Sequence, residues 1–232
     1  MPFGVGFDFD HTLGIDNKIE RVAFLRLLDR LHTDGPSAAS QEQETATIDA
    51  LLNEQRSGKY TIDEAVIRFV RAHTPSVGDF SEYIAWYKTT VLDTVDDFVV
   101  PLPGTIEMLA ALQTRKVPMA LLSNGWSPLQ ARKAARVGFQ GPVLVSDEIG
   151  SLKPDPRAFA RLLEALQVPA SQAFYVGDNP VVDIVGCMNA GIAGVWLDAE
   201  GITYPPELQQ PSRTIHALSE LLNVLPGSER AV

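Results

Sequence analysis

The alternation of helix and strand from Pro101 onward constrains the fold of this chain more than any other feature. Short apolar segments recur there with helical patterns between them, and each is typical of a buried strand. The predicted strands are 117–123 (VPMALLS), 142–146 (PVLVS), 173–177 (AFYVG) and 194–198 (GVWLD). Alternating strands and helices predict a parallel sheet that is covered by helices on both faces, and therefore an α/β fold.

The first residues of the chain predict one more strand. In residues 3–9, aromatic or branched side chains alternate with glycine and aspartate, a period of two that indicates a strand with two different faces. A lone strand cannot be buried, so this one must join the sheet. Residues 14–100 carry only helical patterns. We therefore expect a core domain made of residues 1–13 and 101–232, and an inserted all-helical domain made of residues 14–100.

Asp8 and Asp10 fall on the same face at the end of this first strand. Two converging carboxylates repel each other and are costly to desolvate. They persist if a cation lies between them, if one holds a proton, or if the strand end is wet. The alternative is that they only form a turn or cap a helix. The two residues alone leave both readings open.

Three predicted helices begin in the same way. Ser127-Pro128, Asp155-Pro156 and Asn179-Pro180 each offer an N-cap residue followed by proline at the first helical position. In a parallel sheet such helix starts lie at the carboxyl edge, where ligands bind and where free N–H groups favour anions. The simpler interpretation is that these residues are helix caps and nothing more.

Polar residues near these caps, and one more in the first stretch of the chain, are expected to meet Asp8 and Asp10 at one edge of the sheet. They are Thr12, Ser123, Asn124, Lys153, Asp178 and Asp183. A group of carboxylates with spare oxygen positions suits Mg²⁺. A lysine and a hydroxyl opposite it suit a phosphoryl group.

Charge and composition narrow the class of partner. The net charge is −10 and the pI is about 4.8, so nucleic acid and anionic membranes are disfavoured as partners. No apolar run approaches membrane-spanning length, and no basic region followed by an apolar run opens the chain. Cys187 is the single cysteine, which excludes an internal disulfide and favours a reducing compartment. We therefore expect a cytoplasmic protein.

Four motifs then carry a resemblance. DFDHT at 8–12, LLSNG at 121–125, LKPDP around Lys153 and GDNPVVD ending at Asp183 resemble, in order, the four motifs of the haloacid dehalogenase superfamily. The helical insertion after the first motif resembles the C1 cap of that superfamily. The resemblance implies a Rossmann-like core with a helical cap, and an active site at the four motifs.

The resemblance also implies roles in catalysis. Asp8 would be the nucleophile that forms an aspartyl-phosphate. Asp10 would protonate the leaving oxygen and then act as the base for the attacking water. Lys153 would neutralise the nucleophile and the transferring group.

Further roles concern the metal and the phosphate. Asp8, the backbone carbonyl of Asp10 and Asp178 would bind Mg²⁺, with Asp183 as a direct or water-bridged ligand. The other implied contacts are with the substrate and the loop: Ser123 and the backbone of Asn124 would hold phosphate oxygens, and Thr12 would orient Asp10 and its loop.

Asp10 decides between branches of the superfamily. The dehalogenases carry tyrosine at this position, and the phosphonate-cleaving members carry a small residue, whereas an alkoxide leaving group needs an acid. We therefore expect a Mg²⁺-dependent phosphatase that acts on a small phosphorylated metabolite. The alternatives are a sugar phosphomutase of the same superfamily, or a non-catalytic binding or regulatory protein on the same fold. Sugar phosphates, phosphoglycolate and nucleotides all stay open as substrates. The residues left without a role are His11, Arg56, Lys59, Tyr60 and Trp126.

Overall fold

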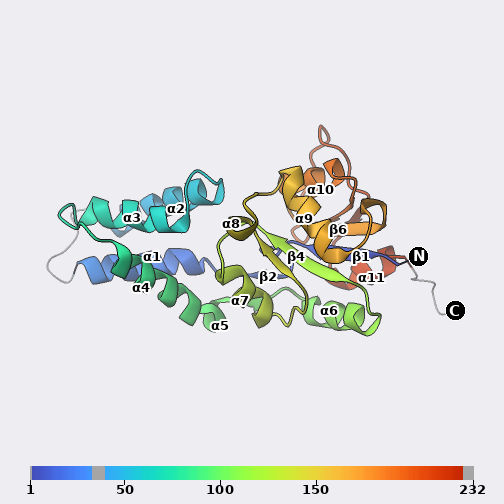
Figure 1. The fold of residues 1–232 in the computed structure, drawn as a ribbon, viewed down its shortest axis with the longest axis horizontal. Coiled ribbons are helices and arrows are strands. Elements are labelled where there is room, and N and C mark those ends of the chain that lie inside the picture. Colours follow the sequence, from blue (N-terminus) through green and yellow to red (C-terminus); the bar gives the residue numbers. More distant parts are fainter. Residues whose placement is uncertain (1, 33–39, 227–232) are drawn as a thin grey trace. The chain divides into compact units, whose positions relative to one another are not determined.

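The computed structural model describes residues 2–32 and 40–226 (Figure 1). Contacts between Cα atoms divide the chain into two compact units. One unit consists of Met1–Ile15 and Val100–Val232, and the other is Asp16–Val99. The domain boundaries at residues 14 and 100 that the sequence suggests stay a prediction.

A six-stranded sheet forms the centre of the first unit, in the order β5-β4-β1-β6-β7-β8. All the neighbouring strands pair in parallel. The strands are β1 (Gly4–Phe7), β4 (Met119–Ser123), β5 (Val143–Val145), β6 (Ala173–Gly177), β7 (Ala193–Leu197) and β8 (Arg213–Ile215). The predicted parallel sheet is confirmed, and the first strand lies between β4 and β6. The short edge strand β8 is not predicted from the sequence.

Helices cover both faces of this sheet, with α9 on one side and α6 on the other (Figure 1). The helical elements of this unit are α6 (Thr105–Thr114), α7 (Leu129–Arg136), α8 (Ser146–Ile149), α9 (Pro156–Leu166), α10 (Gly186–Asn189), α11 (Leu221–Val224), the 3-10 turns η1 (Ala170–Gln172) and η3 (Leu218–Glu220), and the π-helical turn η2 (Pro180–Val185). Phe159 and Leu162 of α9 pack with Leu122 and Tyr175 of the sheet, all buried.

Two of the three predicted N-caps are confirmed. Asp155 caps α9 and accepts a hydrogen bond from the N–H of Arg157, and Asn179 caps η2 through Val181 and Val182. Each is followed by proline at the start of the helix. The prediction for Ser127 is wrong, because α7 starts at Leu129 and Pro128 is its N-cap residue. The N–H of Ser127 instead donates to Asp147 Oδ2 at 2.9 Å, which holds the residue in the preceding loop.

A two-stranded antiparallel ribbon completes the first unit. Strand β2 (Gly14–Ile15) pairs with β3 (Val100–Pro101), and Ile15 lies opposite Val100. The ribbon joins the two ends of the chain segment that forms the second unit. The chain therefore leaves the first unit and returns to it at adjacent points.

Helices are the only regular elements among the described residues of the second unit, 16–32 and 40–99. Its helices are α1 (Ile19–Leu31), α2 (Gln41–Arg56), α3 (Ile62–His73), α4 (Ser81–Asp93) and α5 (Val95–Phe98). Thr61 caps α3, and its side chain accepts a hydrogen bond from the N–H of Glu64. The rings of Phe24, Phe69 and Tyr87 form its buried centre, with Phe24 lying 5.1 Å from Phe69 and 4.5 Å from Tyr87 between ring centroids. Within the described residues, none of the helices is both long and apolar enough to cross a bilayer.

Candidate active site

The polar residues of the four motifs lie at the carboxyl ends of the three central strands. Asp8 follows β1, Ser123 ends β4 and Asp178 follows β6. Because β1 lies between β4 and β6 and all three are parallel, these residues meet at one edge of the sheet. A hydrogen bond from the N–H of Asp8 to the carbonyl of Val176 at 2.9 Å fixes the strand end.

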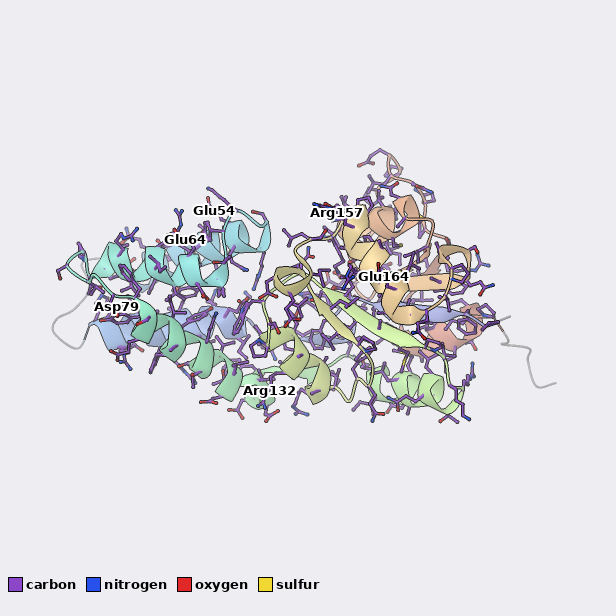
Figure 2. The ribbon with its side chains drawn as sticks, viewed as in Figure 1. Glu54, Glu64, Asp79, Arg132, Arg157 and Glu164 are labelled. Atoms are coloured by element: carbon purple, nitrogen blue, oxygen red, sulfur yellow. The ribbon has the colours of Figure 1, made fainter. Side chains whose placement is uncertain are left out.

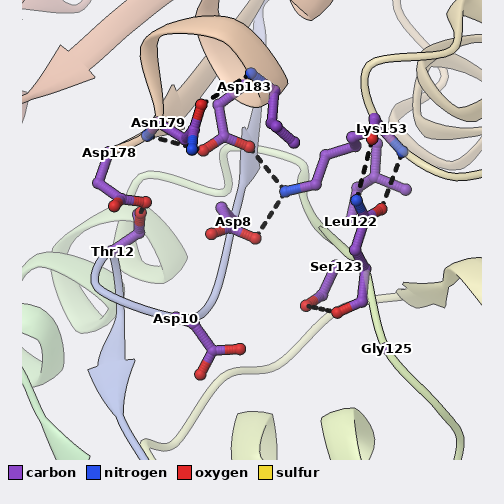
Figure 3. A network of polar contacts seen from close by, with 12 residues as sticks. Asp8, Asp10, Thr12, Leu122, Ser123, Gly125, Lys153, Asp178, Asn179 and Asp183 are labelled. Carbon is purple, nitrogen blue, oxygen red and sulfur yellow. Dashed lines mark hydrogen bonds and ion pairs between the residues drawn. The ribbon is translucent and has the colours of Figure 1, made fainter. Parts of the chain in front are cut away.

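Lys153 connects the two buried carboxylates of the site. Its Nζ lies 2.6 Å from Asp8 Oδ1 and 2.7 Å from Asp183 Oδ1 (Figure 3). The side chains of Lys153 and Asp183 are 2% and 1% exposed, so this ion pair is shielded from solvent. Lys153 and Asp8 are 145 positions apart in sequence, and the fold brings them into direct contact.

Tyr175 also belongs to this group, although none of the four motifs contains it. Lys153 Nζ donates to its hydroxyl oxygen at 2.9 Å, and that hydroxyl donates to the carbonyl of Leu122, also at 2.9 Å. Gly6 makes room for it, since a Cβ at Gly6 would lie 2.8 Å from the Tyr175 ring. The only sequence feature that could indicate a role for Tyr175 is its hydroxyl group, which is the one polar side-chain group in the strand AFYVG.

Asp178 approaches the site from the side opposite to Lys153 (Figure 3). The hydroxyl of Thr12 donates to Asp178 Oδ1 at 3.5 Å. The family resemblance implies that Thr12 orients Asp10, whereas the hydroxyl of Thr12 lies against Asp178. The reason is geometric, because the turn that follows Phe9 carries Thr12 toward the end of β6.

The turn η2 positions Asp183. Asp183 Oδ2 accepts a hydrogen bond from the N–H of Asn179 at 3.0 Å. The Asp183 side chain also lies directly against Gly177, where a Cβ would come within 2.5 Å of it. A side chain at residue 177 would therefore displace the carboxylate.

The loop after β4 is tied to the backbone of Lys153. Asn124 Nδ2 donates to the carbonyl of Lys153 at 3.0 Å, and the N–H of Lys153 donates to Asn124 Oδ1 at 2.8 Å. Ser123 is buried beside it, and its hydroxyl lies 3.5 Å from the carbonyl of Asn124. The Asn124 side chain is thus committed to the loop, and the phosphate contact of its backbone N–H stays a prediction.

Asp10 lies apart from this group, and its carboxylate is 37% exposed. Its partner is a second buried lysine, Lys133, whose Nζ lies 2.5 Å from Asp10 Oδ1. Lys133 lies in α7 and is not predicted from the sequence, since the string QARKAAR reads as an exposed helix face.

Burial controls proton affinity at this edge. It raises the pKa of Asp8 to about 7 despite the opposing charge of Lys153. Burial, together with the charge of Asp8, also raises the pKa of Asp178 to about 6. The pKa of Asp183 is raised by burial as well. For Lys153, burial lowers the pKa, but the charges of Asp183 and Asp8 outweigh it, so the pKa lies well above its usual value.

The donor set fits a hard divalent cation. Asp8, Asp178 and Asp183 each offer a carboxylate oxygen, and these three oxygens lie within 4.8 Å of one another. Oxygen ligands at this spacing suit Mg²⁺. Burial raises the pKa of all three carboxyl groups, and a cation bound between them would favour their ionised forms.

A pocket of about 420 Å³ adjoins Asp178. Its polar lining consists of His11, Asp178, Asp198 and Glu200, and its apolar lining of Ile15, Leu102, Leu197, Ala199 and Ile202. His11 is exposed and has a φ of 58°, in the left-handed region. The turn therefore holds His11 beside Asp178 in the lining of this pocket.

The remaining residues without a role lie in different parts of the two units. In the helical unit, Arg56 pairs with Glu20 at 3.2 Å and Lys59 with Glu54 at 2.7 Å. Tyr60 donates to the carbonyl of Leu51 at 2.9 Å. In the core unit Trp126 is buried, and Cys187 is a buried thiol packed among core side chains.

The family model for haloacid dehalogenase-like hydrolases matches residues 4–191. Because this match covers well over half of the 232 residues, the chain belongs to the haloacid dehalogenase-like hydrolases. The family expected from the four motifs is therefore confirmed, as is its Rossmann-like core with a helical insertion.

Two relatives and one solved structure illustrate the range of this family. The chain is 31% identical to the pyrimidine 5'-nucleotidase YjjG of Escherichia coli, over 58% of this chain and 60% of the relative. It is 40% identical to a phosphoserine phosphatase of Thermus thermophilus, over 41% of this chain and 40% of the relative. These matches thus span about half of the relatives' lengths. A crystal structure of a 2-haloacid dehalogenase from Pseudomonas syringae superposes with a TM-score of 0.71 and 27% identity, covering 95% of this chain and 96% of that one.

Proposed function

We propose that this chain is a Mg²⁺-dependent phosphatase that hydrolyses a small phosphate monoester through an aspartyl-phosphate on Asp8. The observation that carries the proposal is the contact of Lys153 with Asp8 at 2.6 Å, beside a three-carboxylate group and with a second aspartate two residues along. The two phosphatase relatives support the same reaction class.

The first step forms a bond between a carboxylate oxygen of Asp8 and phosphorus. The bond from phosphorus to the leaving oxygen breaks, and Asp10 gives that oxygen a proton. Lys153 keeps its charge throughout and offsets the negative charge of the transferring group. The hydroxyl of Ser123 and the backbone N–H of Asn124 would hold the phosphoryl oxygens.

The second step regenerates Asp8. Asp10, now ionised, takes a proton from water, and the water oxygen attacks phosphorus. The bond between phosphorus and Asp8 breaks, which releases inorganic phosphate and returns the free carboxylate. When bound by Asp8, Asp178, Asp183 and the carbonyl of Asp10, Mg²⁺ would supply the positive charge that lets two anionic groups approach.

Asp10 favours this reaction over dehalogenation, although one similar structure is a dehalogenase. A halide leaves without a proton, whereas an alkoxide requires one, so a carboxyl group two residues after the nucleophile suits a phosphate ester. The phosphomutase alternative would need unshared cationic groups for a second phosphate. Arg56 and Lys59 already pair with Glu20 and Glu54, and we do not favour it.

The substrate class and setting are part of the proposal. We expect a small phosphorylated metabolite as the partner, and a nucleotide and phosphoserine are the first compounds to screen because two relatives are named for them. The single cysteine is buried, which fits a reducing compartment such as the cytoplasm.

An assay with an aryl phosphate and Mg²⁺ tests this proposal. Asp8→Asn should lose turnover by about a thousandfold or more, because the amide is not a nucleophile. It should keep the fold, since a neutral side chain suits a buried position. The matched control is Asp97→Asn, an exposed aspartate of α5, which should match the wild type. Near-normal turnover by Asp8→Asn, or turnover that persists in excess chelator, would refute the assignment.

A further inference from the structure

Lys133 is buried in the core unit, although the helix that carries it is otherwise rich in exposed charge. Its side chain is 1% exposed, and its Nζ lies 2.5 Å from Asp10 Oδ1 and 4.9 Å from the centre of the Phe9 ring. A buried ammonium group is costly unless it is paired. The chain therefore maintains a charged group at Asp10 at an energetic cost.

Helix α7 directs this lysine inward. Leu129, Gln130, Lys133 and Ala134 form its buried face, while Arg132 lies exposed on the same helix (Figure 2). Lys133 thus occupies a buried position where an apolar side chain would avoid the cost of desolvating a charge. A purely structural role would be served by leucine or methionine at this position.

The two buried lysines of the site bind different carboxylates. Lys153 contacts Asp8 and Asp183, whereas Lys133 contacts Asp10. The Asp10 side chain is 37% exposed, compared with 12% for Asp8. Burial alone therefore does not hold the Asp10 carboxylate in one orientation. The ion pair with Lys133 uses Oδ1, and this orientation leaves Oδ2 to meet the leaving group.

We propose that Lys133 is a positioning residue, which holds the Asp10 carboxylate in the orientation needed for proton transfer to the leaving oxygen. This inference rests on the proposed phosphatase function and extends it to a residue outside the four motifs. Lys133 acts through Asp10 and does not itself bind the phosphoryl group. Misplacing a reacting group by about 1 Å costs on the order of a hundredfold in rate.

Comparing two classes of ester tests this role. An alkyl phosphate has a poor leaving group and depends on the acid, whereas an aryl phosphate such as 4-nitrophenyl phosphate depends on it much less. Lys133→Met should lower kcat on the alkyl ester by about a hundredfold and on the aryl ester by roughly tenfold or less, with KM little changed. Lys133→Arg should recover most of the loss, and the control Arg132→Met should match the wild type.

A second arm uses the Asp10→Asn background. In Asp10→Asn, the release of aryl alcohol during a single turnover measures the rate of the first step, the transfer to Asp8. Adding Lys133→Met should not slow this release further, because the group that Lys133 positions is already gone. Thermal unfolding of each variant reports its stability, and Lys133→Gln replaces Lys133→Met if the latter does not fold.

Several other results would overturn the proposed role of Lys133. Equal losses on both esters, or a further loss in the Asp10→Asn background, would assign Lys133 to structure alone and overturn the proposal. A raised KM with unchanged kcat would make Lys133 a substrate ligand, which also overturns it. If the wild type turns over neither ester, the proposed function fails and this role fails with it. Wild-type activity combined with equal losses overturns only the role of Lys133.

Discussion

Burial decides the proton affinity of Asp8. The carboxylate is in contact with Lys153, yet desolvation is the larger effect and its pKa rises to about 7. The folded, metal-free protein therefore binds a proton at Asp8 more tightly than the unfolded chain does. The resulting stabilisation is fully present below about pH 4 and is lost as the pH rises through about 7.

Mg²⁺ should compete with these protons. Because Asp8 and Asp178 must be ionised to bind it, the increase in Tm on adding Mg²⁺ should be larger near pH 8 than near pH 6. Thermal unfolding with and without Mg²⁺ at the two pH values measures this directly. In Asp8→Asn the increase should shrink at both. An equal increase in the wild type at both pH values would contradict a role for these carboxylates as ligands.

Tyr175 gives a second prediction at the residue scale. Tyr175→Phe removes the acceptor for Lys153 Nζ and the donor to the carbonyl of Leu122. We expect the free energy of unfolding to fall by about 1–3 kcal/mol, measured by urea denaturation, because buried polar groups lose a partner. The control is Tyr83→Phe in α4, a half-buried tyrosine of the helical unit, which should cost less than about 0.5 kcal/mol. Equal losses for the two variants would mean that the Tyr175 hydroxyl contributes nothing.

Among the elements, the turn between β6 and α10 builds the side of the site that carries Asp183. Asn179 caps η2 and its N–H binds Asp183, while Gly177 admits the Asp183 side chain at close range. The close approach is steric: a Cβ at Gly177 would lie 2.5 Å from Asp183 Cβ and Cγ. Glycine is therefore the residue that this packing requires.

Gly177→Ala should displace Asp183 and weaken Mg²⁺ binding by about tenfold or more. Isothermal titration calorimetry with Mg²⁺ gives the affinity. Gly78→Ala is the matched control, since its new Cβ would meet nothing within 4 Å. An unchanged affinity in Gly177→Ala would show that Asp183 does not contribute to the cation site.

The elements that local pattern specifies are predicted well. The strand at 173–177 has the bounds that its sequence indicates, and Asp155 and Asn179 cap their helices as expected. The failures have long-range causes. Ser127 is held by Asp147, and Lys133 points inward because α7 packs beside Asp10. Neither contact is visible in the local pattern.

In the whole molecule, the large sheet is built without any strand from the helical unit. All six strands of the large sheet belong to the first unit. The order of motifs predicts which strand ends meet, because parallel strands place their carboxyl ends at one edge. The sequence does not predict the partners of the buried lysines, since those depend on how helices pack over the sheet.

Replacing residues 16–99 by a short glycine-rich linker should leave a folded core. Ile15 and Val100 are paired neighbours in the β2–β3 ribbon, so a hairpin turn can join them. We expect cooperative thermal unfolding and a Tm that Mg²⁺ still raises. A chain without a cooperative transition would show that the core depends on the inserted helices.

The proposed reaction requires that Asp8 becomes phosphorylated. The most direct measurement is acid quenching of the protein during turnover of an aryl phosphate with Mg²⁺, followed by mass spectrometry of the peptide that contains residues 8–12. We expect a phosphoryl group on Asp8, its absence in Asp8→Asn, and its accumulation in Asp10→Asn, which lacks the base for hydrolysis. Turnover without phosphorylation of Asp8, or with the phosphoryl group on another residue, would contradict the proposed reaction.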